Sequence, residues 1–158
     1  MKTSEIGLAL IKKWEGFSST PYLDPIGIPT IGYGFIRYPG GVRVTTQDES
    51  ITIAQADELL LQLLTQNYEA DVHRLITAPL NQNQFDALVS FTYNLGAGNL
   101  AKSTLRRKVN LDPSNPSIRS EFTRWNQAAG RVLEGLTNRR QAEAALYFRP
   151  YNLKNQTR

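Results

Sequence analysis

The chain of 158 residues contains no cysteine and a single histidine, His73. The missing cysteine excludes disulfides, thiolate metal sites and cysteine nucleophiles, and it suits synthesis in a reducing cytosol. A zinc amidase or peptidase recruits at least two histidines or cysteines, and a serine triad needs a histidine base. Because Asp71 and Arg74 flank His73, we interpret it as a surface histidine on a helix. Any catalysis must therefore depend on carboxylates, and we expect neither a metal nor a cofactor.

The sequence also lacks an apolar run long enough for the core of a signal peptide or for a membrane span. We therefore expect no signal peptide, no anchor and no stable membrane insertion, so that the chain stays in the cytoplasm until another factor releases it. The net charge of +4 and the isoelectric point of about 9.5 suit an anionic polymer such as nucleic acid, cell wall or a membrane face. No basic stripe is interleaved with aromatic residues, so nucleic acid is not the expected partner.

The N-terminal part is predicted to begin with a short helix over residues 4–15 that ends at Gly16. Residues 17–46 are rich in glycine and proline, and they contain short β segments at 30–35 and 42–45. A sheet this small rarely stands alone. We expect it to pack against the rest of the chain.

A long connecting helix is predicted over residues 53–76. It begins with a capping box formed by Thr52 and Gln55, and it ends before Pro79. The rest of the chain is predicted to be helical. The expected helices run from 81 to the glycines at 96 and 98, from 102 to 109, from Pro116 to Gly130 and from 137 to 148.

These elements predict an α+β fold in a single domain of residues 1–158. A small β-containing lobe occupies about residues 15–50, and the helix over 53–76 joins it to a larger helical lobe at about 80–148. A basic tail at 149–158 lacks apolar periodicity. Substrate sites often form between two such lobes.

Two carboxylates and one hydroxyl in the small lobe have the chemistry to cleave a glycosidic bond. Glu15 closes the first helix between Trp14 and Phe17, where the helix dipole and the apolar neighbours favour a neutral proton donor. Asp24 lies in a turn and stays ionised, while Thr30 can orient a water whose proton Asp24 takes. The alternative is that Asp24 is an ordinary turn residue, Glu15 an exposed helix-end residue and Thr30 an ordinary strand residue.

The order of these residues belongs to a longer pattern. Asp24 follows Glu15 by nine residues, and Thr30 follows Asp24 by six and opens the run Thr-Ile-Gly-Tyr-Gly. Four further blocks lie at 84–96, 103–105, 122–125 and 135–140. Together the blocks resemble the bacteriophage-type lysozymes, the endolysin family of muramidases, over about residues 6–148. One position departs, because Phe35 stands where many members have a supporting histidine, so that no histidine of this chain belongs to the site.

The resemblance implies a lysozyme-like fold and a function in host cell lysis. Members hydrolyse the β-1,4 bond between N-acetylmuramic acid and N-acetylglucosamine in peptidoglycan, with inversion at the anomeric carbon. By resemblance, Glu15 is the general acid, and Asp24 and Thr30 position or activate the water.

Three further residues receive roles through the resemblance alone. Tyr93 and Asn94 match the far wall of the cleft and are implied to contact sugar; alternatively, Tyr93 packs and Asn94 caps a helix end. Arg139 matches an arginine that pairs with the catalytic glutamate; alternatively, it is a solvated charge on a helix.

The sequence also allows other functions. A lytic transglycosylase needs an acid but no hydrolytic water, so Asp24 and Thr30 argue against it. A catalytically inactive peptidoglycan-binding protein of the same fold would not need the three residues together. The positive charge alone would suit a membrane-active or nucleic-acid-binding protein. We further expect a monomer that, by resemblance, leaves the host cytoplasm for the periplasm and cell wall after a holin has opened the membrane.

Overall fold

The computed structural model describes residues 1–155, and it begins with helix α1 (Glu5–Glu15). Ser4 caps this helix by accepting a hydrogen bond from the backbone N–H of Gly7. Gly16, at φ +69°, ends it and donates its own N–H to the carbonyl of Lys12 at 3.0 Å. The predicted helix over 4–15 is therefore confirmed, and Glu15 is its last residue.

The small lobe contains one antiparallel pair of strands, β1 (Ser18–Leu23) and β2 (Pro29–Gly32). Tyr22 pairs with Thr30, and a bulge separates this part of the ladder from Ser18. Two of the predicted β segments need correction. The segment at 30–35 ends at Gly32, because Ile31 and Phe35 exchange backbone hydrogen bonds across a tight turn. The segment at 42–45 is not a strand, since its pairing is the isolated bridge between Arg37 and Arg43.

The connecting helix is continuous from residue 53 to residue 75. It consists of α2 (Ile53–Leu63), a π-helical turn (Leu64–Tyr68) and α3 (Glu69–Leu75). The capping box of Thr52 and Gln55 is formed as predicted. The sequence did not predict the π-helical turn, which lies in the middle of the helix and carries Tyr68.

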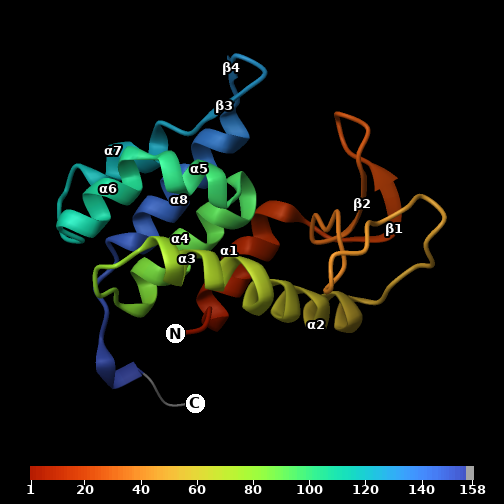
Figure 1. The fold of residues 1–158 in the computed structure, drawn as a ribbon, viewed down its shortest axis with the longest axis horizontal. Helices are drawn as coiled ribbons and strands as arrows, with labels where there is room; N and C mark the ends of the chain where they lie inside the picture. Colours follow the sequence, from red (N-terminus) through yellow and green to blue (C-terminus); the bar gives the residue numbers. More distant parts are fainter. Residues whose placement is uncertain (156–158) are drawn as a thin grey trace.

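The helical lobe is built around α4 (Gln82–Leu95), which packs against α1, α3, α5 and α8. Around it lie α5 (Ala97–Lys102), α6 (Thr104–Leu111), α7 (Ile118–Thr123) and α8 (Glu134–Tyr147). Phe85, Leu88 and Phe91 of α4 are almost completely buried. Figure 1 shows this lobe at one end of the molecule, the two strands of the small lobe at the other, and α2 running between them.

Several predicted boundaries in the helical lobe were wrong. The helix at 102–109 is replaced by α5 and α6, which meet where Ser103 caps α6. The helix from Pro116 to Gly130 ends at Thr123, and a hairpin of β3 (Gln127–Ala128) and β4 (Arg131–Val132) follows it. Ala129 and Gly130 both have positive φ in its two-residue turn, which is the conformation that a tight hairpin requires.

The last helix and the tail also differ from the prediction. Helix α8 runs from 134 to 147 rather than from 137 to 148. In the tail predicted at 149–158, the structure has a short 3-10 turn (Leu153–Asn155), and residues 156–158 lie outside the described part. None of the helices among residues 1–155 has both the length and the apolar character needed to cross a membrane.

Candidate active site

Glu15 is held between the two lobes. Its Oε1 accepts a hydrogen bond at 2.8 Å from Nη1 of Arg139, which α8 presents from the helical lobe. The side chain of Arg139 is 5% exposed and that of Glu15 is 18% exposed. On the other side, Gly34 lies so close to Oε2 of Glu15 that a Cβ at this position would collide with it. The carboxylate is therefore fixed in position and still reaches solvent.

A cleft of about 450 Å³ opens between the small lobe and the connecting helix, and Gly34, the neighbour of Oε2 of Glu15, is part of its lining. Its lining includes Gly34, Tyr38, the π-helical residue Tyr68 and Tyr93 of α4. The rings of Tyr68 and Tyr93 lie 4.8 Å apart. Burial raises the pKa of both tyrosines, and the negative charge of Glu15 raises each pKa further.

Asp24 and Thr30 lie at the turn end of the small hairpin. Oδ1 of Asp24 accepts hydrogen bonds from the backbone N–H groups of Ile26 and Ile28, each at 2.9 Å. The hydroxyl of Thr30 is buried and donates to the carbonyl of Ile28 at 2.9 Å. Each side chain therefore stabilises the turn, and each keeps oxygen lone pairs that can accept a further hydrogen bond.

Tyr22 lies opposite Thr30 in the hairpin. Because the two residues pair directly, their side chains share one face of the hairpin. Burial raises the pKa of the Tyr22 hydroxyl, and the charges of Glu15 and Asp24 raise it further.

Of the two neighbouring residues predicted to contact sugar, Tyr93 lines the cleft, whereas Asn94 is not part of its lining. The hydroxyl of Tyr93 donates to the carbonyl of Tyr33 at 2.6 Å and so links the lobes. Asn94 does not cap a helix end, because Gly96 is the C-cap of α4. Its Oδ1 instead accepts a hydrogen bond at 2.7 Å from Nη2 of Arg140.

Sequence reasoning missed five residues around the site: Tyr22, Tyr68, Ser90, Arg140 and Glu143. The last three belong to a buried polar network that contacts Arg139. The spacing of Glu143, four residues after Arg139 on one helix, was a signal that could have found it. Phe35, at the position of the family histidine, is 2% exposed and packs edge-on against Tyr33.

The single histidine of the chain does not line the cleft. His73 is exposed on α3, as predicted; its Nε2 lies 2.8 Å from the carbonyl of Met1, and its ring packs near Phe85. Within residues 1–155, no group of three or more histidine, aspartate or glutamate side chains is arranged to hold a metal ion.

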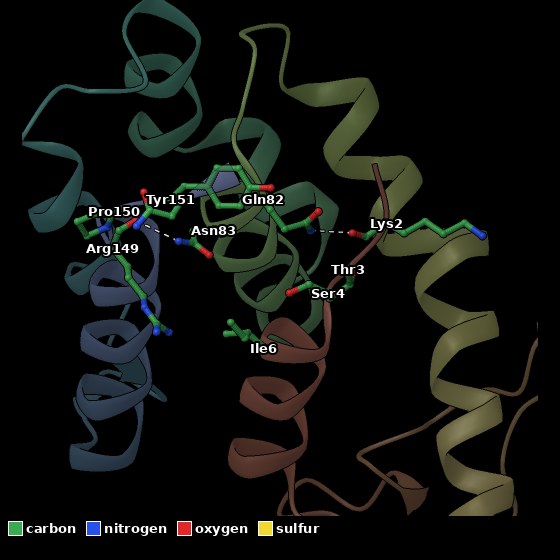
Figure 2. A pocket seen from close by; sticks show the side chains of 10 residues that line it. Lys2, Thr3, Ser4, Ile6, Gln82, Asn83, Arg149, Pro150 and Tyr151 are labelled. Atoms are coloured by element: carbon green, nitrogen blue, oxygen red, sulfur yellow. Dashed lines mark hydrogen bonds between the residues drawn. The ribbon is translucent and has the colours of Figure 1, made fainter. Parts of the chain in front are cut away.

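A larger cavity, of about 640 Å³, lies at the N-terminal end of α1, where the N-terminal residues meet the segment after α8. Figure 2 shows Gln82 donating to the carbonyl of Lys2 and Asn83 donating to that of Arg149, so that the start of α4 ties both segments together. Glu15 is the last residue of α1 and lies at the other end of this helix. The 450 Å³ cleft is the candidate active site because its lining includes Gly34, which lies against Oε2 of Glu15.

Comparison with known proteins gives a consistent result. The family model described as phage lysozyme matches residues 12–143. The chain is 37% identical to the endolysin of Salmonella phage P22, with 94% of this chain and 99% of that protein covered. It is also 37% identical to the endolysin of Bacillus phage PZA, but it spans only 55% of that protein's length. Among solved structures, the endolysin from Escherichia coli O157:H7 phage FAHEc1 matches with a TM-score of 0.84 and 38% identity, with 94% of each chain covered.

Proposed function

Because this chain belongs to the phage lysozyme family and has its lysozyme-like α+β fold, we propose that it is an endolysin that hydrolyses peptidoglycan. The proposed bond is the β-1,4 linkage between N-acetylmuramic acid and N-acetylglucosamine. The observation that supports this proposal is that Glu15 is fixed by Arg139 and by Gly34, a residue that lines an open cleft.

In the proposed reaction, the neutral acid of Glu15 gives its proton to the leaving glycosidic oxygen. The carboxylate that forms on Glu15 is stabilised by Arg139, whose Nη1 is already 2.8 Å away. Asp24 takes a proton from a water that the hydroxyl of Thr30 orients, and the oxygen of that water bonds to the anomeric carbon from the opposite face. The sugar product is therefore inverted. Tyr93 and Asn94 are proposed to contact the glycan.

The experiment is analysis by mass spectrometry of the fragments that the protein releases from purified peptidoglycan. Wild type is expected to yield fragments with a reducing N-acetylmuramic acid end. Glu15→Gln and Asp24→Asn should each reduce the rate of release by about 10²–10⁴-fold, the usual contribution of an acid or base. Asparagine keeps the oxygen that accepts from Ile26 and Ile28, so the turn should survive this change.

Two results would contradict the proposal. Release by Glu15→Gln at the wild-type rate would remove Glu15 as the acid. Fragments ending in a 1,6-anhydro sugar would instead assign the protein to the lytic transglycosylases. Circular dichroism spectra of each variant show that a lost activity is not a lost fold.

We also propose that the protein acts as a monomer, and that a holin gives it access to the wall from the host cytoplasm. Sedimentation analysis of the purified chain tests the first point. For the second, expression in a bacterial host should cause lysis when a holin is expressed with it, and lysis by the chain alone would argue against this requirement.

A further inference from the structure

Four charged side chains form a continuous buried row behind the cleft. Glu15 contacts Arg139 at 2.8 Å, Nε of Arg139 lies 3.5 Å from Oε2 of Glu143, and Oε1 of Glu143 lies 2.6 Å from Nε of Arg140. Arg140 then donates to Asn94 near the end of α4. The charges alternate in sign and cancel. The row therefore joins the proposed acid to α4 through α8.

Glu143 is the centre of this row and has no part in the proposed reaction. Its side chain is completely buried, and Oε2 accepts a hydrogen bond from the hydroxyl of Ser90 at 2.5 Å. Burial raises the pKa of Glu143, while Arg140, Arg139 and the Ser90 hydroxyl all oppose this effect. A buried carboxylate is costly unless it is paired; here Oε1 lies in an ion pair with Arg140, and Oε2 lies near both the Ser90 hydroxyl and Arg139.

Glu143 and Ser90 together determine where Arg139 points. The guanidinium of Arg139 has its Nε beside Glu143, its Nη2 donating to the Ser90 carbonyl at 3.3 Å and its Nη1 donating to Glu15. The contacts with Glu143 and with the Ser90 carbonyl hold the guanidinium in place, and the contact through Nη1 reaches the proposed acid. A substitution at Glu143 should therefore alter the position of Arg139 and, through it, the environment of Glu15.

We propose that Glu143 is a positioning residue for the acid, holding Arg139 against Glu15 and offsetting the positive charge of Arg139 and Arg140. The inference rests on the proposed role of Glu15. An arginine without such an offset would favour the ionised form of its partner carboxylate more strongly. Glu143 thus lets one arginine both orient Glu15 and permit it to hold a proton.

The other groups around Glu15 come from different elements and are unchanged when Glu143 is substituted. The charge of Glu15 acts on Tyr22 of the small lobe, on Tyr68 of the π-helical turn and on Tyr93 of α4. A shift in pH dependence caused by substitution at residue 143 is therefore assigned to the row on α8.

The test is the pH profile of peptidoglycan hydrolysis by wild type and Glu143→Gln. Removing the negative charge leaves the positive charge of the two arginines behind the cleft without its offset. The alkaline side of the profile should therefore move down by about one pH unit, and the acidic side should stay in place.

Glu121→Gln is the matched control. Glu121 is also a buried glutamate between two cations, with Lys108 at 2.9 Å and Arg124 at 3.2 Å, but it belongs to the α6–α7 region. Both variants should lose thermal stability. A shift of the alkaline side in Glu143→Gln alone supports the proposal, whereas profiles that are merely lowered in both variants, with no shift, overturn it.

Ser90→Ala gives a second measurement that does not depend on the folding of Glu143→Gln. It removes the hydrogen bond to Oε2 and makes Glu143 easier to protonate, so the alkaline side should move in the same direction by a smaller amount. An unshifted profile in a folded Ser90→Ala protein counts against the proposal. Full activity of Glu15→Gln in the same assay would instead show that Glu15 is not the acid. The failure of the proposed function can therefore be told apart from the failure of the proposed role of Glu143.

Discussion

The hydroxyl of Tyr93 donates a hydrogen bond at 2.6 Å to the backbone carbonyl of Tyr33 and thereby ties the central helix of one lobe to the small lobe. The ring of Tyr33 in turn belongs to a polar cluster of the small lobe, because its hydroxyl donates to Asp57 at 2.8 Å and Asp57 pairs with Lys12 of α1. The two lobes are therefore held at the cleft by directed bonds as well as by apolar packing.

Tyr93→Phe should lower the free energy of unfolding by about 1 kcal/mol, because one hydrogen bond is lost and the Tyr33 carbonyl loses a partner. The rate of peptidoglycan hydrolysis should also fall, since the lobes lose a link beside the proposed acid. Urea unfolding and the hydrolysis assay measure the two effects.

Tyr147→Phe is the matched control, because the hydroxyl of Tyr147 also donates to a backbone carbonyl, that of Pro113, at 2.7 Å. It should show a similar loss of stability with an unchanged rate per folded molecule. Equal losses of rate in both variants would mean that the bond from Tyr93 has no special part in the site.

Gly34→Ala should damage the site more than the fold. Gly34 has φ +76°, where an alanine costs about 1–2 kcal/mol, and the new Cβ would push Oε2 of Glu15 aside. Gly130→Ala imposes the same φ of +76° in the β3–β4 turn, with no atom within 4 Å of the new Cβ. Both variants should lose comparable stability, but only Gly34→Ala should lose most of its activity. Retained hydrolysis by Gly34→Ala would show that Glu15 tolerates displacement.

Local signals in the sequence predicted much of the fold. The capping boxes at Thr52 and Asn81 act within a single turn, and both are formed. The hairpin at 127–132 was missed because Phe122 and Trp125 have helical spacing. Trp125 does contact the core, with its ring 5.8 Å from that of Phe91, although it lies beyond the end of α7. The spacing of Phe122 and Trp125 therefore predicted correctly that both side chains contact the core, but it predicted the wrong backbone conformation after Thr123.

The contacts of the candidate site could be predicted less well than the helices, because they join residues that are far apart in the sequence. Arg139 and Glu15 are 124 residues apart in sequence, and no local rule pairs them; the resemblance alone implied this contact. The buried row through Glu143 was not expected at all, because a glutamate on a helix is usually solvated. The apolar surroundings expected for Glu15 are replaced on one side by a guanidinium.

The unfolding free energy should decline between pH 10 and pH 12. Burial, together with hydrogen bonds to Asp57 and Asp48, raises the pKa of Tyr33 and of Tyr38 from 10.0 to about 12. Above pH 10 the unfolded chain releases these protons before the folded protein does, so the stability present below pH 10 is lost as the pH rises through 12.

Urea unfolding at several pH values in this range, with wild type, Tyr33→Phe and Tyr38→Phe, tests the assignment. Each substitution removes one titrating hydroxyl and should make the decline shallower, and the double variant should have the shallowest decline. A slope in both single variants as steep as in wild type would rule out these two tyrosines as its source.

Thr30→Val tests the role of the Thr30 hydroxyl, because valine keeps the shape of threonine and lacks the hydroxyl. The hydroxyl hydrogen is used in the bond to the Ile28 carbonyl, so the oxygen is left to accept a hydrogen bond, which is how the proposed mechanism has it orient a water. That carbonyl also accepts from the backbone N–H of Asp24 at 2.9 Å, and it therefore keeps a partner in the valine variant. We expect a stability loss of about 1 kcal/mol but a fall in hydrolysis rate of at least about tenfold. Thr30→Ser restores the hydroxyl and should recover most of the rate. If valine and serine variants hydrolysed peptidoglycan equally well, the water would have to be held by another group, and the shared face of the hairpin makes Tyr22 the next residue to substitute.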